Sequence, residues 1–171
     1  TMYRYERPQS GRNREFTQFG IEAFNSDDPM IDAEVISVGY NILKELGIED
    51  ITVNLNTLGD SESRQNYTKA LIKYLKPNIN KLCDDCQKRL EKNPLRILDC
   101  KIDAETSILK NAPKISDYLT EEAKNRFKKL KNLLTIMDID YIVNENIVRG
   151  LDYYDHDVWE YINEDGITLG A

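Results

Sequence analysis

Two hydrophobic patterns divide this chain and limit the folds open to it. Residues 79–137 are mostly of helical periodicity, whereas strand-like segments lie towards both ends of the 171-residue sequence. The last helix of the middle block is predicted to open at Leu119–Thr120–Glu121, ahead of apolar residues at helical spacing. We therefore expect an α+β fold, in which a sheet made from the two ends carries an inserted, mostly helical block.

The N-terminal hairpin is predicted from strand-like segments over residues 2–7 and 15–24, joined by a turn that contains Pro, Ser, Gly and Asn. Alternation along the second strand places Phe16, Gln18 and Glu22 on one face, which indicates a binding site more than a plain core. Four arginines lie in the hairpin, although the net charge is -7. Guanidinium groups suit bidentate contact with phosphate, but a surface hairpin with salt-bridged arginines fits equally well.

Between the hairpin and the helical block the pattern alternates between helix and strand. Residues 30–46 are predicted to form a helix that ends at Gly47, and residues 51–56 a strand. The Gly-Asp-Ser-Glu-Ser run that follows supplies a helix N-cap, and this helix ends before Pro77. Beyond Asp138 the strand pattern returns.

The three cysteines raise the question of a zinc site. Cys83-x-x-Cys86 is followed by Cys100, but a structural site needs four ligands and a second C-x-x-C pair is missing. On a helix, Cys83 and Cys86 share a face with apolar residues, where free cysteine packs as a small hydrophobe. We therefore expect core packing and no structural zinc. The odd number of cysteines favours a reducing compartment over a disulfide framework.

Other charged features have plain explanations. The only histidine, His156, lies between Asp155 and Asp157 and is expected to be solvated rather than a general base. The five basic residues of residues 121–132 are predicted to form a solvated helix face, although a phosphate-contacting surface is the alternative. No apolar run is long enough for a membrane span, and we expect a cytoplasmic protein without membrane contact.

Two segments far apart in the sequence resemble one family. MYRYERPQSGRNREFTQFGIEAF resembles motif 2 of the class II aminoacyl-tRNA synthetases in the form found in histidyl-tRNA synthetases, and VRGLDYYDHDVWEY resembles that family's histidine signature. NLNTLGDSESRQNY and LEKNPLRILDCK, between them, are similar to the segments leading into and through the family's insertion. The resemblance implies part of an antiparallel-sheet catalytic domain over residues 1–76 and 138–171, with the insertion at 77–137.

The resemblance also implies a reaction. The family joins histidine to ATP, supplied with Mg²⁺, to form histidyl-adenylate, and then transfers histidine to tRNA(His). Charge builds on the phosphoryl oxygens during the first step, so positioned cations supply much of the acceleration. The resemblance makes Arg4 and Arg149 the catalytic residues, one on each side of the reacting phosphate. ATP would be bound by Arg4, Glu6, Arg12 and Phe16. Histidine would be bound by Gln18, Glu22, Arg149, Tyr153 and Tyr154.

Two departures accompany the resemblance. Asp155 and Asp157 stand where the family usually has small or uncharged residues, and both would repel an anionic substrate unless they point away. The family's dimer-forming first motif, its later ATP-binding motifs and its anticodon-binding domain do not match this chain. We therefore expect a fragment of a homodimeric enzyme that lacks full activity alone. The alternative is the synthetase-like regulatory subunit of ATP phosphoribosyltransferase, which is non-catalytic and loses the ATP-handling residues.

Overall fold

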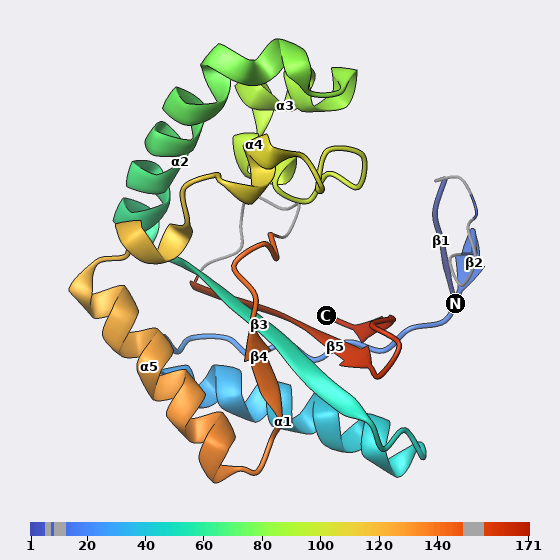
Figure 1. Ribbon diagram of the computed structural model, residues 1–171. Coiled ribbons are helices and arrows are strands. Elements are labelled where there is room, and N and C mark those ends of the chain that lie inside the picture. Colours follow the sequence, from blue (N-terminus) through green and yellow to red (C-terminus); the bar gives the residue numbers. More distant parts are fainter. Residues whose placement is uncertain (6–7, 9–12, 149–155) are drawn as a thin grey trace.

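The protein is built around a mixed sheet (Figure 1). The structure is a computed structural model that describes residues 1–171 except 6–7, 9–12 and 149–155. Four strands lie in the order β4-β3-β5-β6, with β3 parallel to β4, β5 antiparallel to β3, and β6 antiparallel to β5. Their bounds are Ile51–Gly59 for β3, Tyr141–Val143 for β4, His156–Asn163 for β5 and Thr168–Gly170 for β6. The predicted α+β class is confirmed.

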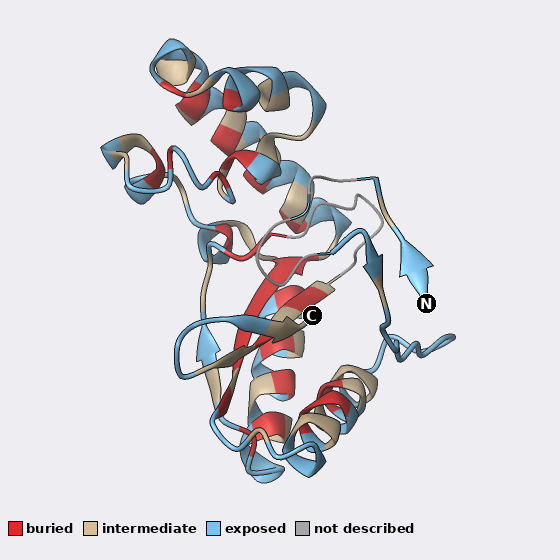
Figure 2. Ribbon diagram, turned by 90° about the vertical axis from the view of Figure 1, so that its right-hand side faces the viewer, coloured by how far each residue is buried: buried red, intermediate tan, exposed pale blue. Residues whose placement is uncertain are grey.

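Two long helices pack together against this sheet. Helix α1 (Pro29–Glu45) begins where the Asp28 side chain accepts a hydrogen bond from the backbone N–H of Met30 (2.9 Å), and α5 (Glu121–Ile136) begins after a Thr120 cap. Their apolar stripes form one buried cluster with β3 and β5, and Figure 2 marks the buried residues of these elements in red. The predicted helix over 30–46 and the predicted start at Thr120 are confirmed.

One glycine sets the spacing between α1 and β5. A Cβ atom on Gly39 would lie 2.4 Å from the hydroxyl oxygen of Tyr161, so only glycine fits at this contact. That hydroxyl donates a hydrogen bond to the backbone carbonyl of Ile36 (2.9 Å), which satisfies a polar group inside the core. Burial raises the pKa of Tyr161 to about 12, so the phenol keeps its proton at neutral pH.

Residues 61–119 form a second unit, the helical lobe, above the sheet in Figure 1. It contains α2 (Ser61–Leu75), α3 (Asp84–Lys92) and α4 (Ser107–Lys110), with 3-10 turns at Lys76–Lys81, Pro94–Ile97 and Ile115–Tyr118. Its own apolar cluster includes residues of α2 together with Cys86 and Cys100. The packing thus groups α2 with the helical lobe and α5 with the sheet, whereas the sequence predicted an insertion over 77–137.

The cysteines lie in the core of this lobe, but not on one continuous helix. Cys83 precedes α3 and is its N-cap residue, because the backbone is extended at Leu82 and Cys83, between the 3-10 helix and α3. Cys86 and Cys100 are buried, and Cys83 is half-buried. The predicted packing of these thiols among apolar side chains is confirmed, and the predicted single helical face is wrong.

A small polar network holds the two ends of the helical lobe together. The Asp60 carboxylate accepts a hydrogen bond from the backbone N–H of Ser63 (2.7 Å) and another from the Thr120 hydroxyl. The Ser63 hydroxyl in turn accepts from the backbone N–H of Thr120 (2.9 Å), and the Thr120 hydroxyl from that of Ala123 (3.1 Å). Asp60 and Thr120 therefore cap α2 and α5 while binding each other.

Replacing Asp60 by alanine should lower the free energy of unfolding by about 1–2 kcal/mol, because two hydrogen-bond donors lose their acceptor. The hydrogen bonds from Thr120 and Ser63 lower the pKa of Asp60, so its contribution is present above the unfolded pKa and is lost as pH falls through the folded pKa. Urea unfolding at several pH values should show a constant deficit near neutrality that shrinks below about pH 4. Asp50→Ala, at an exposed carboxylate, should change stability little. An Asp60→Ala deficit that persists at pH 2 would refute the ionic contribution.

The N-terminal segment departs most from prediction. Strands β1 (Met2–Tyr3) and β2 (Glu15–Phe16) form a separate pair that projects away from the four-stranded sheet in Figure 1. The predicted strand over 15–24 is therefore wrong beyond Phe16. A segment with alternating residues forms a hydrogen-bonded ladder only beside a neighbouring strand. Within the described residues β2 pairs with β1 alone. Phe19 and Phe24 are 61% and 78% exposed as a result.

No helix in the described part of the chain has the length and apolar character needed to cross a membrane.

Candidate functional site

Arg4 and Phe16 meet at the base of the N-terminal hairpin. The Arg4 guanidinium lies over the Phe16 ring, 4.1 Å from its centroid. Its Nε donates to the backbone carbonyl of Asn13 (2.8 Å), and the Arg4 backbone N–H donates to the carbonyl of Arg14 (2.8 Å). The strand pairing and these two bonds fix the cation beside the aromatic ring. Such an arrangement offers a permanent positive charge and a stacking surface within one site.

Gln18 lies at a cavity between the N-terminal segment and the sheet. The cavity has a volume of about 410 Å³ and is lined by Gln18, Phe19, Gly39, Trp159, Tyr161 and Leu169, among others. Aromatic walls with few polar groups are typical of small-molecule sites. Two of the lining residues, Gly39 and Tyr161, form the close contact between α1 and β5, so that contact also shapes one wall.

The remaining predicted site residues are not brought together here. Glu22 is exposed on an irregular segment and does not line this cavity. Its predicted place on one strand face with Phe16 and Gln18 is wrong, because β2 ends at Phe16. The other predicted residues lie outside the described part of the chain, and these are Glu6, Arg12, Arg149, Tyr153 and Tyr154.

Asp157, one of the two unexpected carboxylates, points into the protein rather than towards a substrate. Its side chain is 1% exposed and forms an ion pair with Arg126 of α5, which also pairs with Asp32 of α1. Burial raises the pKa of Asp157, while the charge of Arg126 opposes that shift. The expected repulsion of an anionic substrate is therefore countered at Asp157. Asp155 lies outside the described residues.

His156 begins β5 and is half-buried, whereas the sequence predicted a solvated residue. Its backbone has φ of 60°, in the left-handed region, and its carbonyl accepts a hydrogen bond from the Thr57 hydroxyl (3.2 Å). Its buried Nδ1 has no hydrogen-bond partner among the residues that the structure describes. The backbone, not the imidazole, therefore makes the contact that joins this position to β3.

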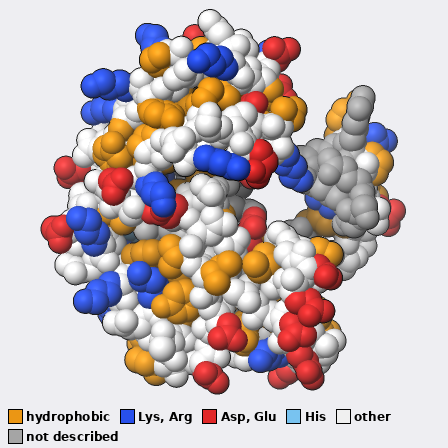
Figure 3. All heavy atoms as spheres, viewed as in Figure 1, with side chains coloured by type: hydrophobic (Ala, Val, Ile, Leu, Met, Phe, Trp, Pro, Cys, Tyr) orange, Lys and Arg blue, Asp and Glu red, His pale blue; other side chains and the backbone are white. Residues whose placement is uncertain are grey.

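The basic residues of α5 are mostly engaged within the protein. Lys124 pairs with Glu121 (2.8 Å), Lys129 pairs with Asp28 (2.9 Å), and the Lys131 ammonium lies 4.8 Å from the centroid of the Phe127 ring. Arg126 pairs with the two buried or half-buried carboxylates described above. Figure 3 shows Lys and Arg scattered over the upper and left parts of the visible face and not gathered in one patch, whereas Asp and Glu are frequent at the lower right. These contacts support the solvated helix face over a phosphate-contacting surface.

One residue that sequence reasoning missed is Asp103. The structure places its carboxylate beside Cys83, Cys86 and Cys100 in the helical lobe. The spacing Cys100-x-x-Asp103 repeats the spacing of Cys83-x-x-Cys86, with a carboxylate in place of the second thiol. A search for four donors rather than four cysteines would have found it.

This chain is similar to proteins of one known family over most of its length. The sequence profile of the family described as histidyl-tRNA synthetase matches residues 1–164. A histidine–tRNA ligase of Bacillus cytotoxicus is 53% identical over 163 residues, which is 95% of this chain and 38% of that protein. A histidine–tRNA ligase of Limosilactobacillus fermentum is 53% identical over 159 residues, or 93% of this chain and 37% of that protein. The chain thus spans less than two fifths of the length of these relatives.

Solved structures give the same picture of the fold. The apo histidyl-tRNA synthetase of S. aureus superimposes with a TM-score of 0.75 and 36% identity, covering 98% of this chain and 40% of that one. A Bacillus halodurans protein described as an ATP phosphoribosyltransferase regulatory subunit/histidyl-tRNA synthetase has a TM-score of 0.50 at 19% identity, over 84% of this chain and 42% of that one. At that identity the second likeness concerns the fold alone.

Proposed function

The chain belongs to the histidyl-tRNA synthetase family, and on that premise we propose that it carries the ATP- and histidine-binding residues of a histidine–tRNA ligase. The reaction has two steps. The histidine carboxylate attacks the α-phosphorus of ATP, which releases pyrophosphate and leaves histidyl-adenylate. A hydroxyl at the 3′ end of tRNA(His) then attacks the carbonyl carbon of the adenylate, which forms the histidyl ester and releases AMP.

The observation that carries the proposal is the fixed position of Arg4 against Phe16. A guanidinium cannot lose its proton at physiological pH, so Arg4 supplies constant positive charge for the phosphoryl oxygens. The Phe16 ring offers its other face for stacking of the adenine base. In the same proposal Glu6 binds the adenine edge, Arg12 lies near the departing pyrophosphate, and Arg149 contacts the reacting phosphate from the opposite side.

The cavity beside Gln18 supports an adjoining site for the amino acid. Gln18 brings a polar amide to a wall that includes the Phe19, Trp159 and Tyr161 rings, which suits a ring with two nitrogens. We assign one imidazole contact to Gln18 in this cavity. The family resemblance adds Glu22, which lies outside the cavity in this structure, and Tyr153 and Tyr154. A pocket that hydrogen-bonds both ring nitrogens would reject analogues without them, because its own buried polar groups would stay unpaired.

Several finer features belong to the same proposal. ATP enters as its Mg²⁺ complex, the enzyme works in the cytoplasm, and it acts as a homodimer. The regulatory subunit of ATP phosphoribosyltransferase is the less favoured alternative, because relatives of about half-identical sequence are ligases and Arg4 is retained. The long helical lobe also argues against it.

Histidine-dependent exchange of labelled pyrophosphate into ATP tests the proposal. The assay should be run on this chain alone and on a protein that carries it within the relatives' full length. We expect exchange from the longer protein and little or none from the chain alone, since the relatives that catalyse the reaction are more than twice as long. If the longer protein bound histidine but catalysed no exchange, the proposed ligase activity would be refuted and the regulatory alternative favoured.

A further inference from the structure

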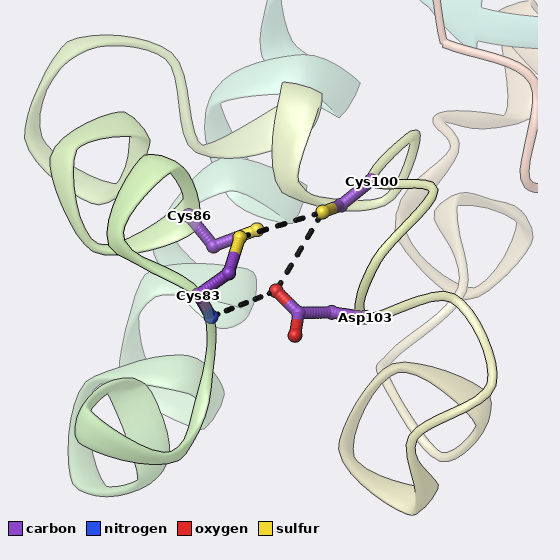
Figure 4. A group of neighbouring side chains, drawn as sticks. All are labelled: Cys83, Cys86, Cys100 and Asp103. Atoms are coloured by element: carbon purple, nitrogen blue, oxygen red, sulfur yellow. Dashed lines mark hydrogen bonds between the residues drawn. The ribbon is translucent and has the colours of Figure 1, made fainter.

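Four metal-ligating side chains converge inside the helical lobe (Figure 4). They are Cys83, Cys86, Cys100 and Asp103, and one ligand atom of each lies within 4.8 Å of the others. Cys83 and Cys86 flank the start of α3, whereas Cys100 and Asp103 lie in the turn after the 3-10 helix Pro94–Ile97. Two separate segments thus each contribute a pair of donors at the same spacing.

Two of the distances among these ligand atoms agree with those expected around one tetrahedral ion, and all of them are within 4.8 Å. Zn–S bonds of about 2.3 Å at tetrahedral angles place two sulfurs about 3.8 Å apart, and a sulfur and a carboxylate oxygen about 3.6 Å apart. The Cys83 and Cys100 sulfurs are 3.7 Å apart, and the Cys100 sulfur is 3.6 Å from Asp103 Oδ2. In a cluster of several irons the cysteine sulfurs belong to different metal atoms and lie farther apart, so the geometry fits a single ion.

Burial makes the carboxylate the informative member of the group. Asp103 is only 5% exposed, and the ion pairs between described residues do not include it. Its Oδ2 accepts a hydrogen bond from the backbone N–H of Cys83 (3.0 Å), which aims the carboxylate at the start of α3. Among the described residues no cationic side chain forms an ion pair with this buried carboxylate, and a metal ion would compensate its charge.

The surrounding backbone favours negative charge at the same place. Cys83 is the N-cap residue of the nine-residue helix α3 and Cys86 lies in its first turn, where the helix dipole opposes the burial that raises the pKa of the Cys86 thiol. The Thr106 hydroxyl donates to the backbone carbonyl of Asp103 (2.7 Å) and holds the second segment in its turn. The donors are therefore oriented by main-chain contacts before any ion arrives.

We propose that Cys83, Cys86, Cys100 and Asp103 form a structural zinc site that joins the start of α3 to residues 98–106. Three sulfurs and one oxygen suit Zn²⁺, and four protein ligands leave no open position for catalysis. On binding, each thiol sulfur bonds the metal and releases its proton to solvent, so one Zn²⁺ displaces three protons. The three cysteines alone fall short of the four ligands of a structural zinc site, and Asp103 is the fourth donor.

Metal analysis of the protein, purified under reducing conditions, is the direct test. We expect about one zinc per chain in the wild type and in Asp85→Asn, which removes an exposed carboxylate between Cys83 and Cys86. Asp103→Asn should bind zinc at least about ten-fold more weakly, because the carboxylate that bonds the metal is lost. Cys86→Ser should lose the metal.

Cobalt substitution gives a second readout that does not depend on the variants folding. Co²⁺ added to metal-free wild type should give the intense visible bands of a tetrahedral site and thiolate charge transfer in the near ultraviolet, and Zn²⁺ should bleach both. Zinc-free wild type whose three thiols react at once with a thiol reagent, with no cobalt spectrum, would overturn the site. An Asp103→Asn spectrum and affinity identical to wild type would overturn the assignment of the fourth ligand. These measurements do not involve pyrophosphate exchange, so they stand apart from the proposed reaction.

Discussion

Replacing Arg126 by alanine should lower the free energy of unfolding by about 3–5 kcal/mol, because it leaves a buried carboxylate without its partner. Arg126 is 13% exposed, and the Asp157 side chain that it contacts is 1% exposed. The same guanidinium reaches Asp32, so one side chain joins α5 to β5 and to α1. Few surface substitutions have effects of this size.

Urea unfolding of Arg126→Ala beside Lys129→Ala provides the measurement. Lys129 also pairs with an aspartate across elements, but its side chain and that of Asp28 are 53% and 52% exposed, so its loss should cost under about 1 kcal/mol. A second variant, Arg126→Met combined with Asp157→Leu, should recover much of the lost stability, because both charges leave together. Equal losses from Arg126→Ala and Lys129→Ala would contradict the buried-pair account.

The Arg126→Ala deficit should also depend on pH in a definite direction. Burial raises the pKa of Asp157 even with Arg126 present, and removing the cation removes the main opposing influence. An acid with a raised folded pKa binds more protons in the folded state, so stability rises as pH falls from the folded pKa towards the unfolded one. The deficit should therefore be larger at pH 7 than at about pH 4.

Replacing Arg4 by alanine should reduce pyrophosphate exchange by about 10²–10³-fold in the protein that shows it, because a positioned donor at the developing charge is lost. Two contacts of the Arg4 side chain explain why an arginine is needed at this position. Arg4 Nε is held by the Asn13 carbonyl and the guanidinium lies over Phe16, so the group is oriented without any ligand present. A lysine at this position would keep the charge but lose the planar, forked group that makes both contacts at once.

The matched variants are Arg4→Lys and Arg96→Ala. Arg4→Lys should fall between wild type and alanine, since it keeps the charge and loses the planar fork. Arg96 is exposed on the helical lobe, and its replacement should leave exchange unchanged. Circular dichroism should confirm that all variants fold. Full exchange by Arg4→Ala would remove this residue from the proposed mechanism.

Local chemistry was enough to predict much of the fold. The cap in the Gly-Asp-Ser-Glu-Ser run, the start at Thr120 and the apolar stripes behind them predicted where α2 and α5 begin, because these interactions lie within a few residues of one another. The alternation of residues 51–56 likewise predicted β3. The resemblance of two long segments predicted the family, and the predictions for Arg4 and Phe16 fell on residues that contact each other.

Long-range packing decided the rest. The pattern of residues 15–24 was that of a strand, yet a ladder needs a neighbour and β2 stops at Phe16. Arg126 and Asp157 are 31 residues apart, and nothing in either local sequence indicates that the two side chains form a buried ion pair. Asp103 joins the thiols because separate turns of the helical lobe fold back on one another. Hydrogen bonds and caps act along the chain, whereas burial and charge pairing depend on which distant segments meet, and those contacts formed the cavity beside Gln18 and the Cys–Asp cluster.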